Sequence, residues 1–202
     1  MPHTITPREW SIEEATPPTI EPVSLDELKS HARILGDDEN ATLSAILTAA
    51  RQALEIFTRR TFVETTYKIR LDGFPSRREI YLERPPLMAV DSITYTDEDG
   101  APQTLAAADY QVDANVEPGR VVLAPDASWP ATEAQRIASV VIEYRAGYGA
   151  TASTVPEAIR QGILLLAGAW EANREEITPV RLGVIPYGVE RIVWAYRWGD
   201  YR

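Results

Sequence analysis

Cysteine is absent from this 202-residue sequence, and histidine occurs only twice. Without cysteine the chain has no disulfides, no thiolate zinc ligands and no thiol nucleophile. His3 lies near the N-terminus, and His31 stands in a predicted helix without a recognisable catalytic partner. The usual signatures of nucleotide-binding loops, serine hydrolases and zinc proteases are missing as well. We therefore expect no catalytic residues, no metal site and no cofactor.

Long hydrophobic runs and a signal sequence are also missing. The longest apolar run, from Ile163 to Trp170, is much shorter than the roughly 20 residues that a membrane-spanning helix needs. The first ten residues, MPHTITPREW, contain neither a basic region nor an apolar core, so they do not predict a signal peptide. We expect no membrane partner.

Positive charge is scarce. Twenty Lys and Arg residues against thirty Asp and Glu residues give a formal net charge of −10. Binding to duplex DNA requires cations that displace counterions, so the general surface is not expected to bind nucleic acid. The doublet Arg59-Arg60 is interpreted as the end of a helix, favoured by the helix dipole, and Arg77-Arg78 as a solvated loop. An open alternative is that one doublet grips DNA weakly.

The residues that are present are typical of a folded globular protein, with 45% apolar and 25% charged. The first 23 residues hold five prolines, which prevent helix formation and favour an extended arm over residues 1–23. Trp10 is the only large anchor in this arm. It is expected to dock either within the subunit or on a neighbour.

Two helices are predicted over residues 24–61. Ser24 and Glu27 have the spacing of a capping box, in which each side chain accepts a hydrogen bond from the other residue's main-chain N–H group. The first helix should end near Gly36, and Asp37 or Asp38 can cap the second. Apolar residues of the second helix recur at three- and four-residue steps, which predicts one buried stripe. The stripe consists of Leu43, Ile46, Leu47, Ala50, Leu54 and Phe57, and the residues that fall elsewhere are Arg51, Gln52, Glu55 and Arg59.

Residues 62–149 change to a period of two, which is typical of strands. Apolar residues alternate with mostly polar ones around Ile69 and again around Ile142, and turn pairs such as Asp99-Gly100 separate the runs. Strands are predicted at residues 67–71, 79–82, 90–96, 110–113, 120–123 and 140–145. Together they predict a small, mostly antiparallel β domain built of hairpins.

A third helix is predicted near residues 155–174, because the stretch Ile159–Trp170 is apolar almost all round. Thr154 and Glu157 have the spacing of a second capping box. Gly162 and Gly168 lower the helix propensity, and they would permit close packing of another helix. This helix is expected to be central in the fold.

The motif Gly147-Tyr148-Gly149 superficially resembles a nucleotide loop, because it follows a strand and precedes a helix. The third glycine is absent, so a strand-to-helix turn is the better interpretation. The predicted fold class is α+β. A helical core from residues 24–61 and 154–176, completed by a C-terminal helix, carries a small antiparallel β insert at residues 62–149.

The C-terminal segment 177–202 is predicted to form a loop and a last helix. It is rich in aromatic residues and arginine, which are concentrated at protein interfaces. The candidate partner-binding residues are Tyr187, Arg191, Trp194, Tyr196, Arg197, Trp198 and Tyr201. The alternative interpretation is that the last helix folds back onto its own core.

The order of several segments resembles the phage head–tail connector family that includes the gp6-like and gp8-like proteins. These segments include PVSLDELKSHARI at 22–34, REIYLERPPLMAVDSITYTDEDG at 78–100, YRAGYG at 144–149, VPEAIRQGILLLAGAWEANRE at 155–175 and PYGVERIVWAYR at 186–197. The resemblance covers about residues 22–176, with a weaker similarity at the C-terminus. Their order and spacing together indicate the family more strongly than any single segment does.

The resemblance implies a structural subunit rather than an enzyme. Such proteins form a ring, usually of twelve copies, beneath the portal protein at the capsid–tail junction of a tailed phage or a gene transfer agent. The ring extends the DNA channel, through which DNA passes without specific binding, and it docks the next neck protein. The C-terminal segment of such proteins reaches the portal protein, and the particle is assembled in the host cytoplasm.

The residues alone leave two other classes open. One is a carbohydrate- or protein-binding β module, in which Tyr81, Tyr95 and Tyr110 supply stacking faces instead of packing across strands. The other is a hydrolase with an unrecognised pair of carboxylates. No motif in the sequence points to either of them.

Overall fold

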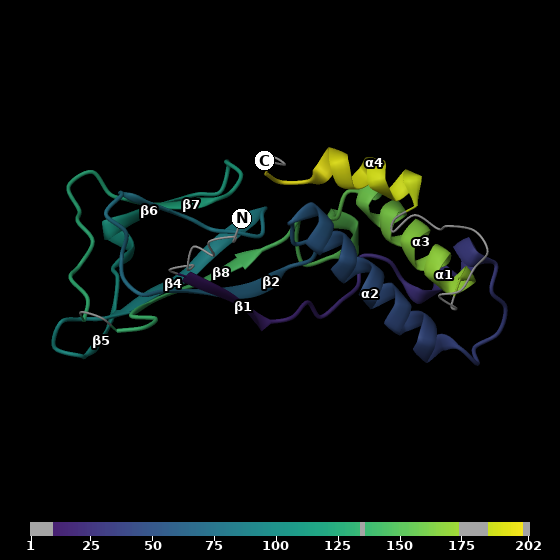
Figure 1. The fold of residues 1–202 in the computed structure, drawn as a ribbon, viewed down its shortest axis with the longest axis horizontal. Helices are drawn as coiled ribbons and strands as arrows, with labels where there is room; N and C mark the ends of the chain where they lie inside the picture. The colour runs from purple at the N-terminus through teal and green to yellow at the C-terminus, as the bar shows by residue number, and fades with distance from the viewer. Residues whose placement is uncertain (1–9, 134–135, 174–185, 200–202) are drawn as a thin grey trace, which may run out of the picture. The chain divides into compact units, whose positions relative to one another are not determined.

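The computed structural model describes residues 10–133, 136–173 and 186–199, and it divides the chain into two compact units (Figure 1). The β unit combines the N-terminal segment up to Pro17 with Thr65–Ala146. The helical unit combines Pro18–Glu64 with the chain from Gly147 onward. The chain therefore passes from one unit to the other three times, and each unit has its own buried apolar cluster.

The described strands of the β unit pair antiparallel in two sheets. One sheet has the order β1-β2-β8-β4-β5 and the other the order β3-β7-β6. A 3-10 helix, η1 (Ala107–Asp109), precedes β6. The strands are β1 Trp10–Thr16, β2 Thr65–Leu71, β3 Glu79–Tyr81, β4 Leu87–Thr96, β5 Pro102–Thr104, β6 Tyr110–Asp113, β7 Arg120–Leu123 and β8 Val140–Ala146.

Strands β2 and β8 form the centre of the larger sheet, and both show the expected alternation of buried and half-buried residues. Ile69 lies opposite Ile142, and Tyr67 lies opposite Tyr144. The hydroxyl of the fully buried Tyr144 donates to the carbonyl oxygen of Glu83 at 2.8 Å. Burial raises the pKa of Tyr144, because the phenolate would lose its solvation, so the hydroxyl remains a donor.

The six predicted strands are all present near their predicted positions, whereas β1 and β5 were not predicted. The expected arrangement in hairpins is correct only for β4–β5 and β6–β7. Strand β8 instead pairs with β2 and β4, which lie far earlier in the chain. Turn residues indicate only local connections, so they do not predict which strands distant in the sequence pair with one another.

The extended conformation predicted for residues 1–23 is present in Trp10–Thr16, but this part is a strand of the β unit, β1, and not an arm. This strand lies at the edge of the larger sheet beside β2, and Trp10 packs against the apolar cluster of the β unit. Trp10 therefore docks within the subunit. Pro17 and Pro18 follow the end of the strand; proline has no N–H group, so it cannot donate a hydrogen bond to a neighbouring strand. Residues 1–9 lie outside the described residues.

The described helices are α1 Leu25–Ala32, α2 Asn40–Thr58, α3 Glu157–Ala172 and α4 Tyr187–Tyr196, with a 3-10 turn, η2, at Ala152–Thr154. They confirm the predicted α+β class. The predicted stripe of α2 is also confirmed, because Leu43, Leu47, Ala50 and Leu54 are buried in the cluster of the helical unit. Helix α3 contributes Ile159, Ile163, Leu166 and Ala167 to the same cluster.

Close packing at the two glycines of α3 is confirmed. A Cβ atom added at Gly162 would lie 3.4 Å from the Cδ1 atom of Ile192 in α4 and 3.5 Å from that of Leu54 in α2. At Gly168 an added Cβ would lie 3.3 Å from the imidazole of His31 in α1. Larger side chains at these two positions would push neighbouring helices away.

Several predicted helix ends are wrong. Helix α1 ends at Ala32, because Arg33 adopts the left-handed conformation that a glycine usually takes, so Gly36 is not needed. Asp37 does not cap α2, since its carboxylate accepts from Lys29 Nζ at 2.7 Å, and Glu39 takes the capping position without a side-chain bond. The second capping box is absent, because the Thr154 hydroxyl donates to the carbonyl oxygen of Thr151 instead.

The first capping box is confirmed. The Glu27 N–H donates to Ser24 Oγ at 3.2 Å, and the Ser24 N–H donates to Glu27 Oε2 at 2.7 Å. Glu27 also forms an ion pair with Arg160. The pKa of Glu27 is lowered, first by the hydrogen bond from the Ser24 main chain and further by the Ser24 hydroxyl and Arg160.

This lowered pKa predicts a pH dependence of stability. A carboxylate with a lowered folded-state pKa stabilises the protein above its unfolded-state pKa, about 4.3 for Glu, and loses this contribution as the pH falls through the folded-state value. Glu27→Gln should therefore be less stable than the wild type at pH 7, and this difference should shrink towards pH 3. Urea unfolding of both proteins at several pH values measures it. A difference that stays constant with pH would contradict the expectation.

The turn at Gly147-Tyr148-Gly149 confirms the strand-to-helix interpretation. The Tyr148 N–H donates to the carbonyl oxygen of Phe62 at 3.1 Å, and the Glu64 N–H donates to that of Gly149 at 2.9 Å. Gly147 has a φ of +131°, and a Cβ atom added there would lie 2.7 Å from the carbonyl carbon of Val63. Glycine is therefore required for two chain segments to approach so closely.

Candidate interaction surface

The C-terminal helix α4 packs onto the core of the helical unit along one of its sides (Figure 1). Val189 and Val193 are buried, at 0% and 6% exposed. After the helix, the N–H of Trp198 donates to the carbonyl oxygen of Thr58 at 2.9 Å, and Arg60 Nε donates to that of Tyr196. The interpretation in which the last helix folds back on its own core therefore describes this side of α4.

The opposite side of α4 is exposed and aromatic. Tyr187 and Trp194 are 70% and 61% exposed, and Arg191 lies between them at the spacing that places all three on one side of a helix. The Arg191 guanidinium lies 4.9 Å from the ring centroid of Tyr187 and donates to its hydroxyl at 2.9 Å. These three residues, Tyr187, Arg191 and Trp194, are called the outer face of α4 below.

The structure thus separates the seven residues that were predicted to bind a partner. Three of them form the outer face, whereas Tyr196, Arg197 and Trp198 are half-buried, and Tyr196 packs against the cluster of the helical unit. Tyr201 lies outside the described residues. The aromatic composition of the segment could not predict this separation, because it depends on which side of the helix meets the core.

The outer face offers binding and no chemistry of its own. An arginine stacked on a tyrosine keeps some of its N–H donors directed at solvent, and the adjacent tryptophan supplies a broad apolar surface. Such a stacked arginine loses less conformational freedom when a partner binds than a free side chain does. This arrangement is typical of an anchor for another protein that presents apolar groups and hydrogen-bond acceptors.

A further sequence-based hypothesis, the carbohydrate-binding module, concerns the β unit. A cavity of about 460 Å³ there is lined by Tyr95 together with Asp109 and Asp126. Tyr110 instead packs against the core, and the ring of Tyr81 carries the guanidinium of Arg77 at 5.6 Å. The structure therefore does not gather the three tyrosines into the stacking groove that a carbohydrate-binding module would need.

The described parts of the chain hold no group of three or more His, Cys, Asp or Glu side chains placed to bind a metal ion. Among the same residues no helix is both long and apolar enough to cross a bilayer.

One arginine of each basic doublet, Arg59-Arg60 and Arg77-Arg78, binds main-chain carbonyl groups within the subunit. Besides the bond from Arg60 to Tyr196, Arg78 donates to the carbonyl oxygens of Ala124 and Ala127.

The comparison with known proteins agrees with the resemblance found in the sequence. Residues 22–116 match the family model described as phage gp6-like head–tail connector protein. This region contains α1 and α2 of the helical unit and the first strands of the β unit after β1. The search among curated proteins gives no match.

Three solved chains share the fold over 95% of this chain and 97% of their own length, each at 22% sequence identity. One comes from the neck of an empty gene transfer agent particle computed with C6 symmetry, with a TM-score of 0.79. The second comes from the virion of a native gene transfer agent particle, with a TM-score of 0.78, and the third from the neck of a native particle computed with C12 symmetry, with a TM-score of 0.72. The predicted resemblance is therefore confirmed: residues 22–116 are similar to the phage gp6-like head–tail connector family, and the chain shares its fold with chains of gene transfer agent particles.

Proposed function

We propose that this protein is a non-enzymatic structural subunit of a head–tail connector ring, located at the capsid–tail junction of a phage or a gene transfer agent. The observation that carries the proposal is the fold match over 95% of this chain to a chain from the neck of such a particle. The match of residues 22–116 to the gp6-like connector family supports it from the sequence.

The ring is proposed to contain twelve copies and to lie between the portal protein and the next neck protein. A closed ring of identical subunits uses two different surfaces of each subunit, so each copy contacts its neighbour head to tail. DNA is proposed to pass through the ring without specific binding. A net charge of −10 per subunit supports this, as does the use of Arg60 and Arg78 to bind main-chain carbonyls.

The outer face of α4 is proposed as the surface that docks on the portal protein. Tyr187 and Trp194 are two of the most exposed large apolar side chains in the described residues, and they share one side of the helix with Arg191. Aromatic residues and arginine dominate the binding energy of many interfaces. Both aromatic side chains leave most of their surface exposed to solvent, where a partner can cover it.

The test replaces all three residues in the variant Tyr187→Ala/Arg191→Ala/Trp194→Ala. Each side chain at the centre of an interface commonly contributes about 2 kcal/mol or more, and a ring multiplies the loss through avidity. We expect the variant to fold as the wild type does and to lose co-purification with the portal protein. Light scattering after size exclusion, with and without portal protein, measures ring formation and docking together.

The matched control is Leu35→Ala, which removes an apolar side chain that is 95% exposed outside the outer face. It should keep portal binding. Portal binding that survives the triple replacement would refute the role of the outer face. A wild-type protein that forms no ring and binds no portal protein would refute the proposed function as a whole.

A further inference from the structure

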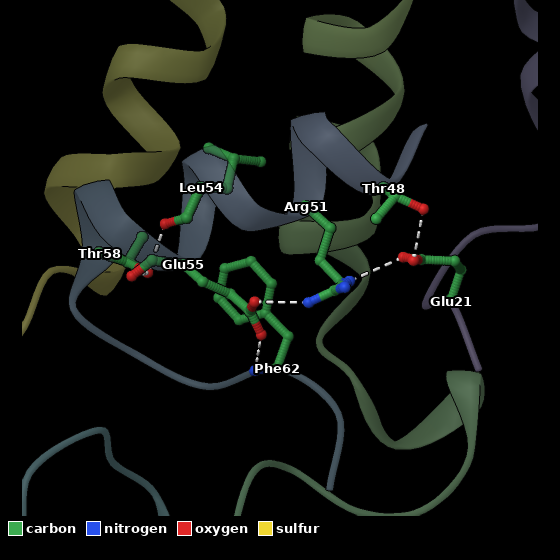
Figure 2. Close-up of polar contacts among 7 residues, drawn as sticks. All are labelled: Glu21, Thr48, Arg51, Leu54, Glu55, Thr58 and Phe62. Carbon is green, nitrogen blue, oxygen red and sulfur yellow. Dashed lines mark hydrogen bonds and ion pairs between the residues drawn. The ribbon is translucent and has the colours of Figure 1, made fainter. Parts of the chain in front are cut away.

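One buried arginine of α2 binds two carboxylates that come from different parts of the helical unit (Figure 2). Arg51 Nε donates to Glu21 Oε2 at 2.8 Å, and Arg51 Nη1 donates to Glu55 Oε2 at 2.7 Å. The side chains of Arg51, Glu55 and Glu21 are 7%, 12% and 27% exposed. Charge-assisted hydrogen bonds that are shielded from water in this way hold their partners in a defined geometry.

Each carboxylate also binds a chain segment next to a point where the chain crosses from one unit to the other. Glu21 belongs to residues 18–22, called the entry segment because the chain enters the helical unit there, after Pro17. Its Oε1 atom accepts a hydrogen bond from the Thr48 hydroxyl at 2.9 Å. Residues 59–64 form the exit segment, after which the chain leaves the helical unit at Glu64. Glu55 Oε1 accepts from the Phe62 N–H of this segment at 2.8 Å (Figure 2).

The segment in which the chain returns to the helical unit is hydrogen-bonded to the exit segment. Residues 147–149, the return segment, bind the exit segment through the two main-chain hydrogen bonds of the Gly147–Gly149 turn. One series of contacts therefore runs from the entry segment through Arg51 and Glu55 to the exit segment, and from there to the return segment. All these residues belong to the helical unit.

We infer that Arg51 is a positioning residue whose contact with Glu21 in the entry segment stabilises the anchoring of the exit segment by Glu55, so that loss of this contact loosens the exit segment. The planar guanidinium is held at two nitrogen atoms, so its orientation depends on both carboxylates. Loss of Glu21 frees one end of this group, and Glu55 then loses the fixed partner that orients its second oxygen towards Phe62. The inference holds for the isolated subunit and is independent of ring formation.

Hydrogen exchange of the full-length protein, followed by mass spectrometry, tests this coupling. Glu21→Ala should speed amide exchange in residues 59–64 by about fivefold or more, the range of typical couplings between sites, although Glu21 bonds to Thr48 and Arg51 in α2. Exchange in α3 should stay unchanged. Trypsin gives a second measurement, because faster cleavage after Arg59 and Arg60 reports a looser exit segment.

The control is Arg160→Gln. Arg160 Nε donates to the carbonyl oxygen of Pro22 at 2.9 Å, so this change loosens the entry segment by a route that bypasses Arg51. It should speed exchange in residues 18–22 and leave residues 59–64 unaffected. Unchanged exchange of residues 59–64 in Glu21→Ala would overturn the inference. An equal increase across α3, or the same increase of residues 59–64 in the control, would overturn it as well.

Arg51→Lys provides an independent variant that keeps the positive charge. The ammonium group is a single point charge and cannot reproduce the fork that joins the two carboxylates. Both the entry and the exit segment should therefore exchange faster than in the wild type. A lysine variant in which the exit segment exchanges at the wild-type rate would show that charge alone suffices, and it would remove the positioning role of the guanidinium.

Discussion

Gly147→Ala should destabilise the protein by about 3 kcal/mol or more, combining the cost of a strained backbone with that of overpacking. Gly147 has a φ of +131°, a backbone conformation that residues with side chains rarely adopt. The new Cβ atom would lie 2.7 Å from the carbonyl carbon and 2.8 Å from the carbonyl oxygen of Val63. Those atoms are main chain, so they cannot turn away as a flexible side chain could. Urea unfolding followed by circular dichroism measures the loss.

Gly36→Ala is the matched control for this prediction. Gly36 also has a positive φ, +89°, but no atom lies within 4 Å of an added Cβ. The control therefore carries only the cost of the left-handed conformation, about 1–2 kcal/mol. Equal losses in the two variants would show that steric contact with residues 62–64 is not what requires glycine at position 147.

Removal of residues 186–202 should destabilise the helical unit by about 3–5 kcal/mol, because burial of each valine side chain contributes about 1.5 kcal/mol or more. Val189 and Val193 are buried in the cluster of this unit, and Ile192 lies against Gly162 of α3. Truncation would expose this apolar surface to water. Thermal unfolding of the truncated and the full-length protein, with the same buffer and concentration, measures the difference.

Trp194→Ala is the control for the truncation. It removes the largest side chain of the outer face, which is 61% exposed, and it leaves the buried side of α4 intact. Its stability should stay within about 0.5 kcal/mol of the wild type, as is usual for surface changes. A truncated protein as stable as this control would show that α4 adds nothing to the core.

The features that could be predicted from the sequence are those whose signal is local. The capping box needs only Ser24 and Glu27, and the structure contains both of its hydrogen bonds. The stripe of α2 follows from helical spacing alone. The six predicted strands follow from alternation and turn residues, because both patterns lie within a few consecutive positions.

The features that could not be predicted depend on residues distant in the chain. The sequence left open whether Trp10 docks within the subunit or on a neighbour, because β2, the strand with which it pairs, lies more than fifty residues later. The spacing placed Arg51 outside the apolar stripe of α2 and did not predict whether it is buried. Its side chain is buried, since the fold brings the carboxylate of Glu21 to it from thirty positions earlier.

The sequence by itself determined the α+β class, the connector resemblance, the net acidity and the presence of an aromatic, arginine-containing C-terminal helix. Only the tertiary structure decided which residues of that helix can meet a partner. Tyr187 and Trp194 face solvent, whereas Tyr196 at the end of the helix is half-buried, as is Trp198 after it. The physical reason is that α4 carries large apolar side chains on several sides, so its orientation is set by the packing of Val189 and Val193 in the core rather than by its own composition.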